Sequence, residues 1–477
     1  MAKFKLGYAP TRRFTFSAED AFKYKTVIRE KIESFGMDID IVDMEGINEE
    51  GLLYNDNISA ELMIERLQRE KVDAVFFPHC NFGTEDTVAR VAKAIGKPVL
   101  LWGPRDEAPL EDGMRLRDTQ CGLFATGKIL RRFKVPFTYI TNSRVDDPVF
   151  ERGFTNFIAA ANVVKQFRNL RILQIGPRPA SFWTMMCNEG ELLERFGIEI
   201  YPITLVDIQQ RTKKIEKSNS PELLETMEFI KRTLDWSEVT EDDIKRIAAL
   251  KLAMRYFADF SGSTAIAIQC WSSLQDSMGI MPCLANAILT DEQIPVTCET
   301  DIHGAITSIM VQAATMNVLP TFFADLTIRH PENPNGELLF HCGNFPVSMS
   351  VEEKPKLRKH FLFDSHAPGT HEGEIKGGEM SLVRFDGDNG EYQLFLGKAK
   401  GIEGPYTRGS YVWAEVNDWP LWEEKLVKGP YVHHTVGIHA NVIPALYEAC
   451  NYIPGLLADP VDPTEQQIQA WLRGAGL

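Results

Sequence analysis

Four segments toward the C-terminal end of the chain carry side chains that could bind a metal ion and move protons. Two carboxylates follow apolar runs, Glu299 in CETDIHGA and Asp325 in FFADL. Two imidazoles come after them, His341 in LLFHCGN and His434 in VHHTVGIH. A carboxylate in apolar sequence is costly to bury without a partner, so Asp325 needs a cation, a strong donor or solvent. Oxygen and imidazole ligands together suit a divalent ion such as Mn²⁺, Co²⁺, Fe²⁺ or Zn²⁺, and the four residues predict such a site.

The distribution of histidines supports a metal site in this part of the chain. Of the ten His residues, only His79 comes before residue 300. Similar ligands could activate water in a metal-dependent hydrolase, although no HExxH motif is present. Asp301 and His303 are close to Glu299 in the sequence, and we expect them to surround the site without binding the metal.

Short strands alternate with longer helices through the first 160 residues. Apolar runs at 4–9, 39–43, 74–78 and 98–102 predict the strands, and the segments between them have helical spacing. Short strands separated by helices of about ten residues or more predict a parallel, doubly wound sheet, in which ligands bind at the carboxyl ends of the strands.

Polar and aromatic residues lie at the carboxyl ends of these predicted strands. Arg12 and Arg13 in APTRR could bind a polar or anionic group of a substrate, with a solvated surface pair as the alternative. Asn81 and Phe82 in PHCNFGTED could line a pocket at another strand end. Later in the chain, Trp413 could stack on a sugar face, although a buried core position is at least as much expected for a tryptophan.

A second α/β unit begins near Arg171, and the character of the sequence changes again near residue 319. The second unit contains the strand-like run RILQIGPRP and an expected helix at 182–196. Beyond residue 319, Gly and Pro rise and short alternating runs predict β-rich structure. No GxGxxG motif is present, which disfavours dinucleotide binding. We expect two doubly wound, Rossmann-like α/β domains followed by a β-rich, barrel-like C-terminal domain, with bounds at 1–165, 166–318 and 319–477.

The overall charge limits the classes of partner. Lys and Arg number 51 and Asp and Glu number 66, which gives a net charge of −15. A chain this acidic is not expected to bind nucleic acid or an anionic membrane surface. The polar N-terminus, the scattered cysteines and the lack of a long apolar stretch predict a cytoplasmic protein without a transmembrane helix.

The motifs around the acidic and imidazole residues resemble those of the L-fucose isomerase and L-arabinose isomerase family of metal-dependent ketol isomerases. Glu299 in CETDIHGA and Asp325 in FFADL match the two acidic metal ligands of that family. The arabinose branch adds a His shortly after the second acid and another in an HHT motif, and here these match His341 and His434 of VHHT. The second acid is Asp, as in the fucose branch, so the chain mixes features of both branches.

The resemblance extends to segments outside these motifs. PHCNFGTED is similar to a family loop that ends in GSE or GTE, and PTRR lies where the family has an N-terminal Arg segment. Gln269 in IQCW matches a substrate-binding Gln, and His433 could hold a sugar hydroxyl or support its neighbour. The fold of the family, two α/β domains and a barrel-like C-terminal domain, agrees with the pattern described above.

The resemblance implies interconversion of an aldose and its ketose through an enediol. Glu299 and Asp325 would be ligands of Mn²⁺, or of Co²⁺ or Mg²⁺, and would also act as acid and base. The family handles L-fucose, L-arabinose, D-arabinose and related aldoses, and the Arg-rich strand ends leave room for an anionic aldose such as sulfoquinovose. A homo-oligomer is also implied, a hexamer in which the first domain of a neighbouring subunit completes each site. The alternatives are a cytoplasmic sugar-binding protein and the metal-dependent hydrolase.

Overall fold

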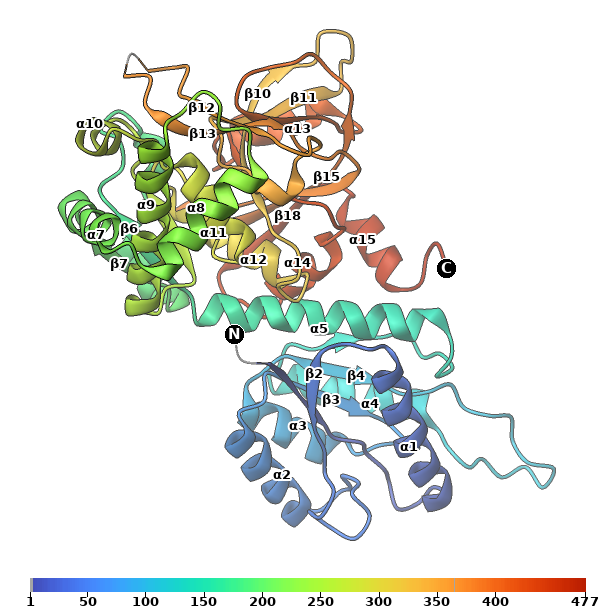
Figure 1. Ribbon diagram of the computed structural model, residues 1–477. Helices are drawn as coiled ribbons and strands as arrows, with labels where there is room; N and C mark the ends of the chain where they lie inside the picture. The colour runs from blue at the N-terminus through green and yellow to red at the C-terminus, as the bar shows by residue number, and fades with distance from the viewer. Residues whose placement is uncertain (1–2, 364) are drawn as a thin grey trace. The chain divides into compact units, whose positions relative to one another are not determined.

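A computed structural model describes residues 3–363 and 365–477 (Figure 1). The chain forms two compact units, the first made of Met1–Lys165 with Glu465–Leu477 and the second of Gln166–Thr464. The predicted domain boundary at residue 318 falls inside the second unit and remains a prediction. Within the described ranges, no helix is both long enough and apolar enough to cross a membrane.

The first unit is built on a five-stranded parallel sheet in the order β2-β1-β3-β4-β5. All residues of the β3 segment AVFFP are buried, which fits a central strand covered on both faces. The predicted parallel α/β arrangement is confirmed here. The strands are β1 (Phe4–Tyr8), β2 (Ile39–Val42), β3 (Ala74–Pro78), β4 (Val99–Trp102) and β5 (Thr138–Tyr139). The helices are α1 (Ala18–Ser34), α2 (Asn57–Glu70), α3 (Glu85–Ile95), α4 (Thr119–Arg132), α5 (Pro148–Arg168) and α15 (Glu465–Leu472).

The second unit begins with a four-stranded parallel sheet in the order β7-β6-β8-β9. Its strands are β6 (Arg171–Ile175), β7 (Glu199–Ile203), β8 (Ala265–Ile268) and β9 (Val296–Thr297). Its longer helices are α7 (Leu205–Ser218), α8 (Pro221–Thr233), α9 (Glu241–Ser261), α10 (Ser273–Met278), α11 (Cys283–Asp291) and α12 (Ile302–Ala313). This second predicted α/β region is therefore also confirmed.

The helix predicted at 182–196 is wrong as a single element. A 3-10 turn, η1 (Trp183–Met185), comes first, and α6 (Glu189–Glu191) then continues into a π-helical segment, η2 (Leu192–Phe196). The side chain of Asn188 accepts a hydrogen bond from Glu191 N at 3.2 Å. Asn188 is therefore an N-cap, which starts a new helix instead of continuing an earlier one.

The rest of the second unit is β-rich, and its strands close into a barrel. The strand order is β12-β13-β16-β11-β10-β17-β14-β15-β18, and an additional pairing of β15 with β16 closes the ring. The predicted barrel-like C-terminal region is confirmed. The strands are β10 (Phe322–Arg329), β11 (Gly336–His341), β12 (Lys356–Lys359), β13 (Pro368–Glu374), β14 (Glu379–Asp388), β15 (Glu391–Ile402), β16 (Ser410–Glu415), β17 (His434–Ile438) and β18 (Leu456–Asp462). The accompanying helices are η3 (Val347–Met349), α13 (Trp419–Lys428) and α14 (Ile443–Cys450).

Apolar side chains of the barrel strands and of α13 pack together. Phe322, Leu339, Phe395 and Trp422 are buried in one core cluster. Gly397 on β15 lies directly against the indole, because a Cβ atom at this position would come within 2.1 Å of Trp422 Cη2. This cluster is packed like other protein cores.

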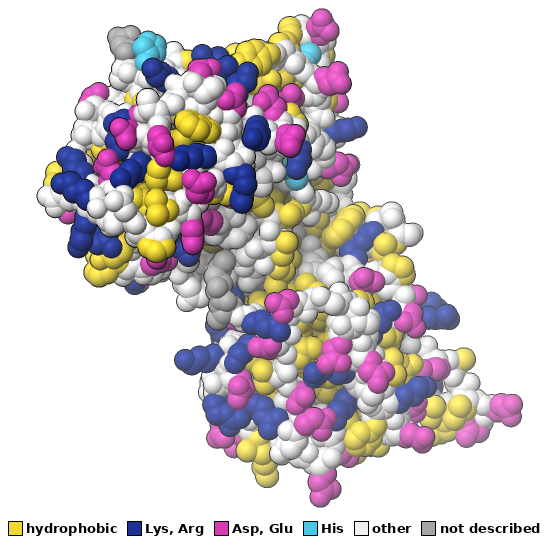
Figure 2. Space-filling view, in the orientation of Figure 1, with side chains coloured by type: hydrophobic (Ala, Val, Ile, Leu, Met, Phe, Trp, Pro, Cys, Tyr) yellow, Lys and Arg dark blue, Asp and Glu magenta, His cyan; other side chains and the backbone are white. Residues whose placement is uncertain are grey.

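Acidic and basic side chains are interspersed over the face of the molecule seen in Figure 2. On that face the Lys and Arg side chains do not merge into one continuous stripe. This mixed pattern agrees with the net charge of −15 and differs from the basic footprint of proteins that bind nucleic acid.

Candidate metal centre

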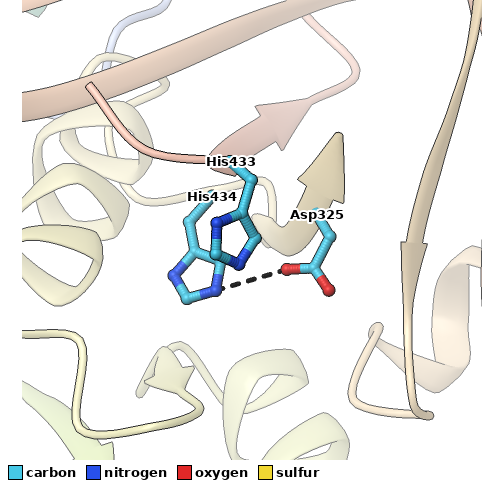
Figure 3. Close-up of side chains that lie close together, drawn as sticks. All are labelled: Asp325, His433 and His434. Atoms are coloured by element: carbon cyan, nitrogen blue, oxygen red, sulfur yellow. Dashed lines mark ion pairs between the residues drawn. The ribbon is translucent and has the colours of Figure 1, made fainter. Parts of the chain in front are cut away.

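Glu299, Asp325 and His434 lie together in the second unit. His434 is the first residue of β17 and pairs in register with Asp325 on β10, so their side chains leave neighbouring strands at the same level. His434 Nε2 lies 3.3 Å from Asp325 Oδ1, and the two side chains point toward each other (Figure 3). The same nitrogen lies 2.9 Å from Glu299 Oε2. Both acids therefore lie within ion-pair distance of one imidazole nitrogen.

Glu299 is held in a turn of unusual conformation after β9. Glu299 and Thr300 have φ angles of 59° and 58°, in a region that residues other than glycine rarely adopt. Thr300 N donates to Ile268 O at 3.1 Å, and Asp301 N donates to Cys298 O at 3.1 Å. Backbone conformations of this kind persist only where the surrounding contacts maintain them, and they cluster at functional sites.

The other nitrogen of His434 faces a third carboxylate. His434 Nδ1 lies 2.9 Å from Asp301 Oδ2, and both side chains are at most 2% exposed. Because an ionised carboxylate only accepts, Nδ1 carries a proton and Nε2 is the nitrogen turned toward Glu299 and Asp325. Burial by itself would lower the pKa of His434, but the hydrogen bond to Asp301 and the nearby carboxylates raise it to about 10.

Glu299 and Asp301 keep their charge in spite of burial. Burial by itself would raise the pKa of Glu299, but the contact with His434 lowers this pKa below its usual value. Burial also opposes ionisation of Asp301, yet Arg384 and His434 hold the pKa of Asp301 well below its usual range. Ionised carboxylates are the form that binds a cation or accepts a proton.

This group of side chains fits a divalent metal ion. Asp325, His433 and His434 each offer one ligand atom within 4.8 Å of the others, and Glu299 contacts His434. Ligand atoms about 2.1 Å from an octahedral ion lie about 3 Å from their neighbours, which is close to the 2.9 and 3.3 Å around His434 Nε2. His434 Nε2 and Asp325 Oδ1 are buried without an aligned hydrogen bond among the described residues. A metal ion bound at Nε2 would replace the proton there.

His341 lies near the centre but is engaged by the backbone. It ends β11, and its ring centroid is 6.5 Å from that of His434 and 5.6 Å from that of Phe323. Its Nδ1 accepts a hydrogen bond from Cys342 N at 2.8 Å, which leaves the proton of a neutral ring on Nε2. To bind a metal through Nε2, His341 would have to give up this hydrogen bond.

The other predicted residues of the second unit have different surroundings. The exposed His433 lies beside the centre, with its ring centroid 4.3 Å from that of His434 (Figure 3). Gln269 follows β8 and is buried, and its Oε1 has no hydrogen-bond partner among the described residues. Trp413 is 2% exposed, belongs to a small apolar cluster, and donates from Nε1 to Pro405 O at 2.8 Å. These contacts favour a role for Trp413 in the core over the predicted stacking on a sugar.

In the first unit, Asn81 joins two of the predicted strand-end segments. Asn81 Oδ1 accepts from Arg13 N at 2.8 Å, and Asn81 Nδ2 donates to Arg13 O at 3.2 Å. Arg13 in turn lies over the ring of Phe82, 4.0 Å from Cζ to the centroid. Asn81 is completely buried, so its polar atoms hold the loops together and do not lie open to a ligand in this structure.

Both arginines of the PTRR segment form ion pairs. Arg12 binds Glu50 through Nε at 2.5 Å and Nη2 at 2.7 Å, an arrangement that uses the fork of the guanidinium. Arg13 contacts Glu85 through Nη2 alone. Of the two, Arg13 therefore keeps more of its donor capacity for an anionic ligand.

Sequence reasoning missed two charged residues of the second unit, Arg384 and Asp386 on β14. Arg384 binds Asp301 and is 1% exposed. Asp386 binds Arg384 on its other side. The available signal was a pair of opposite charges two residues apart in SLVRFD, since such residues share one face of a strand. The pattern alone did not show that this face is buried.

Comparisons with known proteins point to one class of enzyme. Residues 7–168 match the N-terminal domain of the fucose/sulfoquinovose isomerases. A sulfoquinovose isomerase of Alkalicoccus urumqiensis is 26% identical over 343 residues, covering 70% of this chain and 73% of that protein. A sulfoquinovose isomerase of Priestia aryabhattai is 22% identical over 354 residues, covering 72% of this chain and 76% of that protein.

Solved structures add little to this. A periplasmic solute binding protein of an ABC transporter from Actinobacillus succinogenes 130z, with bound D-allose, is 12% identical. The match covers 67% of this chain and 94% of that chain, with a TM-score of 0.17. A score this low does not establish a shared fold.

Proposed function

We propose that the chain is a metal-dependent aldose–ketose isomerase of the fucose isomerase-like family, acting on a sulfonated aldose such as sulfoquinovose. The observation that carries the proposal is His434, whose Nε2 lies within 3.3 Å of both Glu299 and Asp325 while Nδ1 is held by Asp301. Two acids that share one imidazole provide both a cation site and groups that exchange protons.

Glu299, Asp325 and His434 are the proposed metal ligands, and His341 is a further candidate if its ring turns from Cys342 N. The preferred ion is Mn²⁺, with Co²⁺ or Mg²⁺ as alternatives, because two carboxylates and an imidazole suit such ions. When bound, the ion supplies an electrophile for the sugar oxygens.

The chain's own carboxylates move the protons. In the forward direction a carboxylate removes the proton from C2 of the aldose while O1 gains one, which gives the enediol. The proton is then returned to C1 while O2 loses its proton, which gives the ketose. Glu299 and Asp325 both contact His434 Nε2 and suit these two duties, and acid–base help of this kind contributes about 10²–10⁴-fold.

The substrate contacts are proposals of their own. His433 is exposed beside the centre and suits a sugar hydroxyl, and buried Gln269 has a spare acceptor in Oε1. For the anionic group of the sugar we propose Arg13, supported by Phe82, with Arg12 and Asn81 holding the loop. A contact from Trp413 would require its ring to be uncovered.

An assay with a panel of aldoses tests the proposal. Metal-stripped protein with added Mn²⁺ is incubated with sulfoquinovose, L-fucose, L-arabinose and D-arabinose, and ketose formation is followed. We expect the fastest conversion with sulfoquinovose, loss of activity with EDTA and recovery with Mn²⁺. Binding without conversion would favour a sugar-binding protein, and cleavage of a glycoside would favour a hydrolase.

We further propose that the protein is a cytoplasmic homo-oligomer, a hexamer, in which the first unit of one subunit completes the site of another. The support is the family and the presence of Arg13 and Glu299 in different units of the chain. Light scattering measures the assembly, and an active monomer near 54 kDa would refute it. If sites are shared, mixing Arg13→Ala with Glu299→Gln subunits should give activity with the KM of the parent, which neither variant shows alone.

A further inference from the structure

A buried row of charged side chains extends from His434 into the packing between α12 and the barrel. His434 Nδ1 lies 2.9 Å from Asp301 Oδ2, and Asp301 Oδ1 accepts from Arg384 Nη2 at 3.2 Å. On its other side Arg384 Nε donates to Asp386 Oδ2 at 2.8 Å, and His303 Nδ1 lies 2.8 Å from Asp386 Oδ1. The five side chains are between 0 and 11% exposed.

Three elements, α12, β14 and β17 with His434 at its start, bring this row together. Asp301 and His303 lie at the start of α12, where Asp301 is the N-cap, and Arg384 and Asp386 lie two residues apart on β14. Residues two apart on a strand point to the same face, so β14 presents both charges on one side. Phe385 N donates to Thr307 Oγ1 of α12 at 2.9 Å, which fixes the helix against this strand.

The contacts of Asp301 leave its carboxylate little freedom. Oδ2 faces His434 Nδ1 and Arg384 Nη1, while Oδ1 accepts from Gly304 N at 2.8 Å and from Arg384 Nη2. Gly304 is needed for this approach, because a Cβ atom there would come within 2.7 Å of Asp301 Oδ2. A carboxylate accepts about four hydrogen bonds, so Asp301 is saturated and its orientation is set.

Arg384 is the central member of the row. It is the cation between two buried carboxylates, and a guanidinium can bind both at once because its donors form a rigid planar fork. Burial would raise the pKa of Asp386, and Arg384 lowers that pKa below its usual value. Arg384 therefore holds both carboxylates in place, one toward His434 and the other toward His303.

We propose that Arg384 is a positioning residue of the metal centre, which sets the affinity for the metal by holding the Asp301 carboxylate in place against His434 Nδ1. The inference rests on the proposed metal site. Arg384 touches neither Glu299 nor Asp325 in the contacts described above, and it acts through Asp301. Groups that accept a hydrogen bond from the second ring nitrogen of a metal-binding His are important for affinity. Their loss commonly weakens metal binding about 10–100-fold.

The test measures Mn²⁺ affinity of the full-length, metal-stripped protein by the electron paramagnetic resonance signal of free Mn²⁺. Arg384→Lys keeps the charge but cannot bind both carboxylates as a fork, and we expect affinity to fall about 10-fold. At saturating Mn²⁺ the kcat of this variant should return to within a few-fold of the parent, which a general folding defect would not allow. The matched control is Arg408→Lys, which disrupts a two-bond pair with Glu372 elsewhere in the barrel and should leave Mn²⁺ affinity unchanged.

A double-mutant cycle tests the same role if Arg384→Lys fails to fold. Asp301→Asn should weaken Mn²⁺ binding about 10–100-fold, and adding Arg384→Gln should cause little further loss, because Arg384 acts through Asp301. Removing both partners avoids leaving Asp301 as a buried charge without its arginine, and Asp386 keeps its contact with His303. Unchanged Mn²⁺ affinity in Arg384→Lys, or fully additive losses in the cycle, would overturn the positioning role while leaving the isomerase proposal intact. A parent protein that binds no Mn²⁺ and converts no aldose would refute the proposed function itself, and the positioning role with it.

Discussion

Arg12 and Arg13 lie at a strand end of the first unit, and each forms an ion pair with a carboxylate of its own, Glu50 and Glu85. The centre in the second unit is different. Around His434 lie three carboxylates, Glu299, Asp301 and Asp325, and of these only Asp301 is described with an arginine partner. Charges in the first region are balanced by their neighbours, whereas the second region has an excess of negative charge that a cation would relieve.

This difference shows which charged residues at strand ends are candidates for a metal site. Both regions stand out in the sequence by residue type alone. Only the centre also has close-packed ligand atoms without aligned hydrogen bonds, namely His434 Nε2 and Asp325 Oδ1. Residue types can suggest a metal site. The pairing of the nearby charges then indicates whether a cation is needed to balance them.

The largest effect should come from removing a carboxylate of the centre. Glu299→Gln and Asp325→Asn should each lower isomerisation by more than about 10²-fold, because each loses a metal ligand and a proton carrier. Circular dichroism and turnover with saturating Mn²⁺ check this. Glu50→Gln serves as the control, because it removes the carboxylate that pairs with Arg12 in the first unit. Near-normal turnover in either variant of the centre, with metal bound, would remove that carboxylate from the mechanism.

Metal binding at the carboxylates around His434 should raise the free energy of unfolding. With Mn²⁺ at about 100 times its Kd, the free energy of unfolding should rise by about 2.7 kcal/mol, because the ion binds the folded state. Thermal unfolding with and without Mn²⁺ measures this shift. In Asp325→Asn the stabilisation should be much smaller at the same Mn²⁺ concentration, and an equal rise in Tm would place the ion elsewhere.

A third carboxylate environment sharpens the comparison. Glu337 on β11 is 4% exposed, and its nearest cation, Arg329, is 4.0 Å away. Burial raises the pKa of Glu337 to about 7, although Arg329 opposes this shift. Here burial shifts a carboxyl without a close partner toward its neutral form, while Glu299 and Asp301 keep their charge.

Glu337→Gln should therefore stabilise the protein at high pH. In the unfolded chain a Glu has a pKa of about 4.3, so between about pH 4 and 7 the folded state holds a proton that the unfolded state has lost. Stability from this group then falls as pH rises through that window, and the penalty is complete above pH 7. A Gln cannot ionise, so the variant should gain on the order of 2 kcal/mol relative to the parent between pH 5 and pH 8. Denaturant unfolding at both values measures the gain, and a pH-independent difference would contradict it.

The smallest effect on catalysis is expected from Arg12 and Arg13 in the first unit. Arg13→Ala should raise the KM for a sulfonated aldose about 10-fold, or about 1.4 kcal/mol, because Arg13 has donors beyond its Glu85 contact. Arg12→Ala should change this KM by less than about 3-fold, since Glu50 already occupies its fork. Steady-state kinetics with sulfonated and neutral aldoses compare the two. A larger loss in Arg12→Ala would reverse the order of the two arginines.

Some features of the molecule were accessible to local reasoning. The alternation of short apolar runs with helices predicted the parallel sheets, because strand and helix periods are encoded within about ten neighbouring residues. The segments CETDIHGA, FFADL and VHHT nominated Glu299, Asp325 and His434, and the structure brings them together. At 182–196 local spacing was misleading, since Asn188 caps a new helical piece instead of lying within a longer one.

The sequence by itself therefore determined the fold class and the types of residue available for chemistry. The tertiary structure decided which charges meet. Asp325 faces His434 because β10 and β17 pair antiparallel in one register, and a shift by one residue would turn either side chain to the other face. Arg384 meets Asp301 across 83 positions of sequence because α12 packs on β14. Balance of buried charge depends on such distant partners, and no local pattern contains them.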